Sequence, residues 1–109
     1  MIIKPRIKGF VCIISHPIGC LENIREQVDY ATTQEIFNTR KPRRVLVIGS
    51  STGYGLSSRI SAAFSCGADT LGVYFERPAS GERTASAGFY NSQAFCKLAN
   101  KAGLKAEDI

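Results

Sequence analysis

The sequence predicts an α/β fold in which a small parallel sheet is flanked by helices. Three observations carry this prediction. An apolar run at residues 45–48 leads directly into the glycine-rich segment 49–55, a helical pattern follows, and a second strand-like run occupies residues 70–75. Short apolar runs that alternate with helical periodicity are typical of buried parallel strands joined by crossover helices.

The first 43 residues are expected to form a segment with a strand or hairpin and one helix, ahead of a β-α-β-α segment at residues 44–109. Residues 10–14 are predicted to form an apolar strand, with which the irregular residues 2–9 can pair as a hairpin. A helix is expected at residues 20–37, because apolar side chains recur there at three- and four-residue steps. These apolar positions are Leu21, Ile24, Val28 and Ala31.

The second segment repeats the strand and helix pattern. Its first helix places Leu56, Ile60, Ala63 and Phe64 on one face. A third parallel strand is expected to begin near the end of the chain. In order, we predict strand 44–48, a helix that ends near Gly67, strand 70–76, a long connection at 77–88 and a helix at 92–102 that Gly103 can cap.

Glycines at positions 49, 53 and 55 follow the first strand of this segment and allow a tight turn with close backbone approach. The first-turn amides and the positive dipole end of the next helix then face an anion. The arrangement therefore predicts a dinucleotide whose pyrophosphate lies at the turn, in a partial Rossmann-like sheet of the short-chain-reductase kind. A glycine turn that only packs a strand against a helix is the alternative.

Glu76 ends the second strand about 20 residues past the glycine turn, where an acidic group can hydrogen-bond the adenosine ribose hydroxyls. Its charge repels a 2′-phosphate, which predicts NADH over NADPH, although the neighbouring Arg77 can accommodate that phosphate. Simpler roles stay open. Ser51 and Thr52 can cap the helix without a ligand, Tyr54 can be a surface residue, and Glu76 can be an ordinary charge at a strand end.

Several longer strings of residues stand out, at 1–6 with 9–10, 16–20, 44–49 with 51–55, 67–73 with 75–78, and 90–91 with 94–95. Together they resemble one known family, the NADH-dependent trans-2-enoyl-CoA or enoyl-ACP reductases of the single-chain bacterial and euglenid type. The resemblance covers the chain as far as Leu104. It implies that Gly49, Ser50, Ser51, Thr52, Gly53 and Tyr54 hold NADH, and that Phe75 and Glu76 lie against its adenosine end.

That family reduces the enoyl thioester with a tyrosine and a lysine spaced as Tyr-x8-Lys, in the later part of a much longer chain. The pair does not occur here, and neither does the shorter Tyr-x3-Lys spacing. Nine positions after Tyr30, Tyr54, Tyr74 and Tyr90 stand Thr39, Ala63, Arg83 and Ala99, and four positions after them stand Gln34, Ser58, Pro78 and Ala94. No catalytic residue is predicted in this chain, and we expect no turnover from it alone.

The resemblance implies the N-terminal NADH-binding part of a reductase of fatty-acid metabolism, which transfers hydride from NADH to the double bond of an enoyl-CoA or enoyl-ACP. The alternative is a stand-alone nucleotide-binding or regulatory module that acts with a companion chain. A chain of 109 residues holds at most one half of a six-stranded doubly wound fold. The exposed edges of so small a parallel sheet predict self-association.

Composition favours a globular protein of the cytoplasm, with 44% apolar and 21% charged residues and no apolar run long enough to span a membrane. The charged, proline-containing start differs from a signal peptide. The four cysteines lack C-x-x-C spacing and His16 is the single histidine, so we predict reduced thiols and no metal site. His16 precedes Pro17 and suits a structural turn better than a substrate contact.

The net charge of +5 includes a basic cluster at Arg40, Lys41, Arg43 and Arg44. Such a cluster can bind nucleic acid or attract the phosphates of coenzyme A. No RNA-binding aromatic motif accompanies it, so we predict a solvated flank of the first cofactor strand and no nucleic-acid partner.

Overall fold

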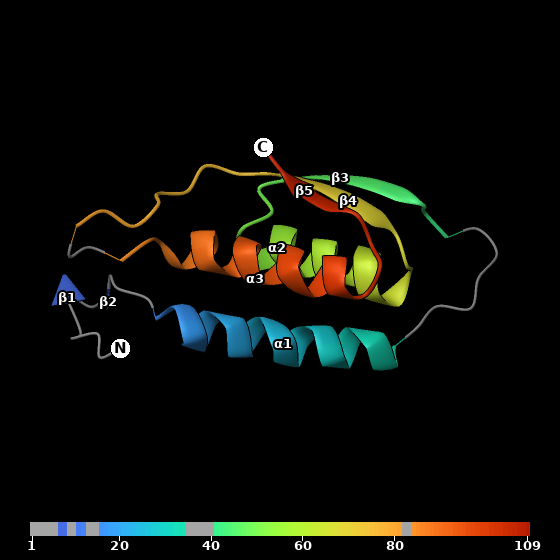
Figure 1. Ribbon diagram of the computed structural model, residues 1–109, viewed down its shortest axis with the longest axis horizontal. Helices are drawn as coiled ribbons and strands as arrows, with labels where there is room; N and C mark the ends of the chain where they lie inside the picture. The colour runs from blue at the N-terminus through green and yellow to red at the C-terminus, as the bar shows by residue number, and fades with distance from the viewer. Residues whose placement is uncertain (1–6, 9–10, 13–15, 35–40, 82–83) are drawn as a thin grey trace.

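The computed structural model describes residues 7–8, 11–12, 16–34, 41–81 and 84–109. In chain order, its elements are β1 (Ile7–Lys8), β2 (Val11–Cys12), α1 (Pro17–Thr33), β3 (Arg44–Ile48), α2 (Gly53–Ile60), the π-helical turn η1 (Ser61–Ser65), β4 (Asp69–Val73), α3 (Ala87–Lys101) and β5 (Ala106–Asp108). Figure 1 shows three layers: the sheet of β3, β4 and β5, then α2 and α3, and then α1. The predicted α/β class is confirmed.

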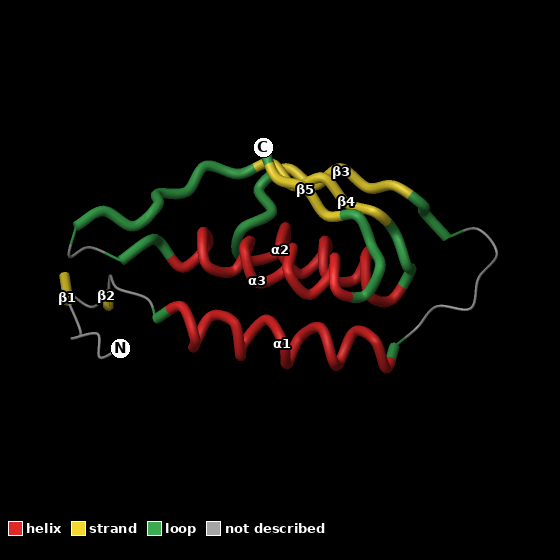
Figure 2. The backbone as a smooth tube through the Cα atoms, viewed as in Figure 1, coloured by secondary structure: helices red, strands yellow, loops and turns green. Residues whose placement is uncertain are grey.

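The sheet is parallel throughout, in the strand order β3-β4-β5. β3 pairs with β4 from Arg44 opposite Asp69 to Ile48 opposite Val73. The tube view in Figure 2 shows α2 and α3, the helices of the two crossovers, on the same face of this sheet. β3 has the bounds expected from the sequence, and β5 supplies the expected third strand.

The helix-covered face of the sheet is buried and the opposite face is not. On β3, Val47 is 8% exposed, whereas its neighbours Leu46 and Ile48 are 60% and 77% exposed. On β4, Thr70 and Gly72 point under the helices and are buried. Because side chains alternate across a strand, the described part of the chain leaves an aliphatic surface bare, which we call the uncovered sheet face.

The hydrophobic core lies between α1 and the second layer. Ile24, Val28 and Ala31 of α1 are buried there, as their spacing predicts, against Phe95 of α3 and Ile60 of α2. Burying one such large apolar side chain contributes about 1.5–3 kcal/mol. The helix of the first segment therefore shares one core with the helices of the second.

A buried charged side chain lies between the sheet and the second layer. Arg59 of α2 is 0% exposed, and its Nη1 forms an ion pair with Asp108 of β5 at 2.5 Å. Its Nε donates to the Thr70 hydroxyl at 3.0 Å and its Nη2 to the Glu107 carbonyl at 2.8 Å. The guanidinium also lies 4.4 Å from the centre of the Phe95 ring. Arg59 thus joins α2, α3 and two strands.

The first segment differs from expectation in its helix bounds. α1 begins at Pro17 rather than residue 20, because the His16 side chain caps it: Nδ1 accepts from the Ile18 amide at 3.1 Å. Proline at the first helical position suits such a start. The short antiparallel pair β1 and β2 agrees with the predicted hairpin. The rest of that prediction, and the expected helix end at residue 37, lie outside the described residues.

The second segment differs from expectation at two boundaries and in the form of one helix. β4 ends at Val73 rather than residue 76, since β3, its partner on one side, ends at Ile48 opposite Val73. α3 begins at Ala87 rather than residue 92, which shortens the expected connection. The helix after the glycine turn widens into η1 before Gly67, whose φ of +72° ends it as expected.

No helix in the described ranges has the length and hydropathy that a membrane span requires. The same residues contain no cluster of His, Cys, Asp or Glu that could hold a metal ion. Cys20, Cys66 and Cys96 are free thiols, half-buried rather than fully buried. In the basic cluster, Arg43 and Arg44 are exposed, and Arg40 is not among the described residues.

Candidate functional site

The glycine-rich turn leaves the carboxyl end of β3 and is fixed to the end of the neighbouring strand. The amides of Gly49 and Ser50 both donate to the Val73 carbonyl, at 2.7 and 3.3 Å. Gly49 has φ +78° and Gly53 has φ +58°. Side chains disfavour this left-handed conformation, so both positions suit glycine.

Gly55 is required for a different reason. A Cβ atom at this position would lie 1.8 Å from the Gly49 carbonyl oxygen, far inside contact distance. The first turn of α2 therefore packs directly on the backbone of the glycine-rich turn. A ligand bound at the glycine-rich turn would therefore contact backbone atoms rather than side chains at Gly49 and Gly55.

The start of α2 presents free donors beside the turn. Thr52 is the N-cap residue, with φ −149° and ψ 171°, yet its hydroxyl makes no capping hydrogen bond. The Leu56 amide donates to the Thr52 carbonyl at 3.2 Å, so the three amides before it, at residues 53–55, have no partner within the helix. These amides and the positive helix end suit a phosphate.

Two serines of the turn point inward. Ser50 is 1% exposed, and its hydroxyl has no hydrogen-bond partner among the described residues. Ser51 is 7% exposed and donates to Oε1 of Glu76 at 2.6 Å. Asn91 of α3 donates to the Ser51 carbonyl at 3.2 Å. The interpretation of Ser51 as a helix cap is thus replaced by a bond to the acidic residue.

Glu76 lies beyond the end of β4, close to the turn. Its half-buried carboxylate also accepts from the Ser86 hydroxyl, just before α3. The two aromatic candidates point to solvent: Phe75 is 100% and Tyr54 is 94% exposed. Large exposed aromatic side chains beside a cradle of amides are available to stack on a planar ligand.

A groove of about 370 Å³ lies beside the turn. Asn23 and Gln27 of α1 line it together with Asn91 of α3, and the remaining lining residues, which include Thr52 and Tyr54, are also uncharged. Sequence reasoning missed Asn23 and Gln27, because only the packing of α1 brings them to the turn. Amide side chains both donate and accept hydrogen bonds, so the groove can contact polar groups of a ligand.

The thiols of Cys20 and Cys96 are not activated for chemistry. Burial, with the charge and hydrogen bond of Asp108, raises the pKa of Cys96 to about 11. Burial also raises the pKa of Cys20. Tyr74 donates to Asp108 at 3.3 Å, and burial and that carboxylate raise the pKa of its phenol. These groups stay protonated near neutral pH, which suits a binding rather than a nucleophilic role.

These features define the class of the protein, a Rossmann-like α/β domain whose glycine-rich turn lies at the carboxyl ends of parallel strands. A family model described as the NAD(P)H binding domain of trans-2-enoyl-CoA reductase matches residues 2–81. The chain belongs to this family.

Relatives with named activities match the whole chain. Enoyl-[acyl-carrier-protein] reductases [NADH] of Yersinia pestis and Burkholderia multivorans are each 56% identical over 109 residues, which are 27% of their length. The crystal structure of Treponema denticola trans-2-enoyl-CoA reductase in complex with NAD is 39% identical, with a TM-score of 0.93 over 100% of this chain and 28% of that one. The chain spans about a quarter of the length of these relatives.

Proposed function

We propose that this chain is the NADH-binding part of an enoyl thioester reductase that acts on enoyl-CoA or enoyl-ACP. One observation carries the proposal: the Glu76 carboxylate, beyond the end of β4, accepts a hydrogen bond at 2.6 Å from Ser51 of the glycine-rich turn that follows β3. The proximity of this carboxylate to the turn supports the proposal, because a ribose and a pyrophosphate of one cofactor would need both groups near each other.

The residues present fit such a cofactor. The amides of residues 53–55 would hold the pyrophosphate, with Gly49, Ser50, Ser51, Thr52, Gly53 and Tyr54 forming the cradle, and Phe75 and Glu76 would lie at the adenosine end. The buried hydroxyl of Ser50, which lacks a partner among the described residues, is available to a ligand or an ordered water. The carboxylate of Glu76 favours a free ribose hydroxyl over a 2′-phosphate, so NADH is the proposed form.

When bound, the cofactor supplies a hydride to the double bond conjugated with the thioester carbonyl, and a proton completes the saturated product. This chain would bind and orient the cofactor. The proton donor and the substrate site would come from the rest of a longer protein or from a companion chain, since the Tyr-x8-Lys spacing does not occur here. We place this function in the cytoplasm, where reducing conditions maintain thiols such as Cys66 and Cys96.

Calorimetric titration of the purified chain with NADH and NADPH tests the proposal. We expect saturable NADH binding, weaker NADPH binding, and loss of both in Gly53→Val, because a β-branched residue at φ +58° distorts the turn. Gly103→Val is the matched control. Gly103 also has positive φ and open space around it, but follows α3 at the far edge of the sheet.

The outcomes separate clearly. NADH binding that survives in folded Gly103→Val and is lost in folded Gly53→Val supports the proposal. Absence of NADH binding by the folded wild-type chain overturns it, and so does equal binding by both variants. Wild-type binding with no turnover of an enoyl thioester directs the search to the catalytic groups outside this chain.

A further inference from the structure

The carboxylate of Glu76 is held from two sides. Ser51 of the glycine-rich turn donates to Oε1 at 2.6 Å, and Ser86, the N-cap residue of α3, donates to Oε2 at 2.5 Å. The two serines lie 25 residues before and 10 residues after Glu76. Charge-assisted hydrogen bonds of this kind are short and strong, so the carboxylate has one fixed orientation.

Space for this carboxylate exists because residue 88 is glycine. A Cβ atom on Gly88 would lie 2.1 Å from Oε1 of Glu76 and 2.9 Å from the Cβ of Ser51. Gly88 belongs to the first turn of α3. The carboxylate therefore rests against the positive end of that helix, where an anion is well placed.

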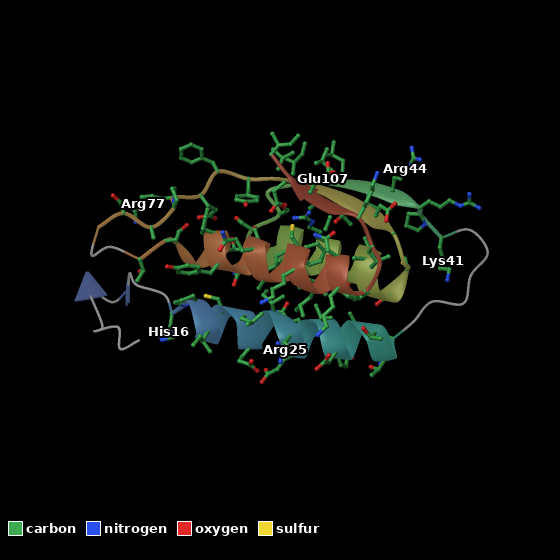
Figure 3. All side chains as sticks on the ribbon, in the orientation of Figure 1. His16, Arg25, Lys41, Arg44, Arg77 and Glu107 are labelled. Atoms are coloured by element: carbon green, nitrogen blue, oxygen red, sulfur yellow. The ribbon has the colours of Figure 1, made fainter. Side chains whose placement is uncertain are left out.

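Ser86 also closes the loop that carries the neighbouring basic residue. Its amide donates to the Arg77 carbonyl at 3.1 Å, and its hydroxyl accepts from the Arg77 amide at 3.3 Å. Arg77 is exposed and lies out along the connection to α3 (Figure 3). One residue thus fixes the acidic group and the base of the loop that holds the basic group.

The Glu76 carboxylate can accept further hydrogen bonds besides those from the two serines. A carboxylate has about four lone-pair sites, and the two serines occupy one on each oxygen. No other described residue donates to this carboxylate, so one site on each oxygen is available to a ligand, which matches the two vicinal hydroxyls of a ribose. A carboxylate that cannot turn away also repels a 2′-phosphate more than a mobile one does.

We propose that Ser86 is a positioning residue for cofactor specificity: together with Ser51 and Gly88, it fixes the Glu76 carboxylate so that the site accepts a free ribose diol and rejects a 2′-phosphate. The inference rests on the proposed function. It adds that the choice between the two cofactors depends on α3 as well as on Glu76.

The test measures dissociation constants of NADH and NADPH for wild type, Ser86→Ala, Ser86→Thr and Ser80→Ala. In Ser86→Ala we expect NADH affinity to fall about tenfold, the scale of one charge-assisted hydrogen bond. NADPH affinity should change less, so the preference for NADH should shrink. Ser86→Thr keeps the hydroxyl and should restore the preference. Ser80 is an exposed serine of the same loop with no side-chain hydrogen bond to the described residues, so Ser80→Ala should match wild type.

If Ser86 has a purely structural role, Ser86→Ala will weaken the binding of NADH and of NADPH by the same factor. That result overturns the inference, while the proposed function stands. A wild-type chain that binds neither cofactor overturns both. Should Ser86→Ala fail to fold, Gly88→Ala displaces the same carboxylate from the other side and must also reduce the preference for NADH. Unchanged preference in folded Gly88→Ala contradicts the inference.

Discussion

Removing the carboxylate of Asp108 leaves the buried cation of Arg59 without its counter-ion. Arg59 is 0% exposed, and its other polar contacts are the Thr70 hydroxyl, the Glu107 carbonyl and the Cys96 thiol, all neutral. In the variant Asp108→Ala the guanidinium keeps these three acceptors and the face of Phe95. It cannot reach water unless β5 or α3 moves, so the variant should unfold more easily.

The size of the effect follows from burial. Breaking a buried ion pair by removing one partner costs about 3–5 kcal/mol. The Asp108 side chain is 21% exposed, so the pair is partly solvated and we take the lower end, about 3 kcal/mol. An unfolding entropy of about 2.1 cal/mol/K per residue gives about 0.23 kcal/mol/K for this chain, so the midpoint should fall by about 13 °C.

Thermal unfolding followed by circular dichroism, at matched protein concentration, measures this shift. Glu107→Ala is the control: its carboxylate is exposed on the same strand and forms no ion pair among the described residues, so its midpoint should change by about 2 °C or less. In Arg59→Met combined with Asp108→Asn the buried charge is gone, and at least half of the loss should be recovered. A midpoint for Asp108→Ala within 2 °C of the control would refute this account of Arg59.

Three further predictions concern the thiols, the turn and the sheet. At pH 8, alkylation of native Cys96 should be about 100-fold slower than that of a thiol with pKa 9.0, because its pKa of about 11 leaves little thiolate; mass spectrometry that finds equal rates in native and unfolded protein contradicts this. Because the raised pKa means that the Cys96 thiol holds its proton more tightly in the folded state, protonation of this thiol stabilises the fold. This contribution to the free energy of unfolding is complete below pH 9 and is lost as the pH rises towards 11. Gly55→Ala should destabilise the chain by about 1–3 kcal/mol in urea unfolding and weaken NADH binding, and an unchanged urea midpoint would count against the contact with Gly49. The wild-type chain should sediment as more than a monomer through its uncovered sheet face, and Ile48→Lys should shift it to a monomer; a monomeric wild type at high concentration rejects this role for the face.

Local patterns were sufficient to predict the main elements. The apolar run before the glycine-rich turn gave β3 its observed bounds, and the spacing of Ile24, Val28 and Ala31 identified the buried stripe of α1. Boundaries set by distant partners were missed. β4 ends where β3 stops, and α3 begins where Ser86 meets Glu76, and neither constraint is visible within a short window of sequence.

Part of the candidate site could likewise be predicted from local sequence, and part could not. The glycine spacing predicted a tight turn, and Gly49 and Gly53 have the positive φ that such a turn uses. The bond from Ser51 to Glu76 shows in addition that the acidic residue lies beside this turn. The contacts of Ser86, Gly88 and Asn91 could not be predicted, because they depend on how α3 packs. Arg59 was missed because a charged residue in an amphipathic helix is normally assigned to solvent.

The ion pair of Arg59 also determines when the core around α2 can close during synthesis. Asp108 follows Arg59 by 49 residues, and translation at about 5–20 residues per second separates them by roughly 2–10 s. Until β5 emerges, the cation has no counter-ion, and closing the core around it is unfavourable. β3, α2 and β4 are therefore not an independent folding unit, because the buried cation of α2 needs the carboxylate of β5. A version of this domain that ends before Asp108 would leave the Arg59 cation buried without its counter-ion, so the stability of a shortened chain depends on this one carboxylate as well as on the number of strands.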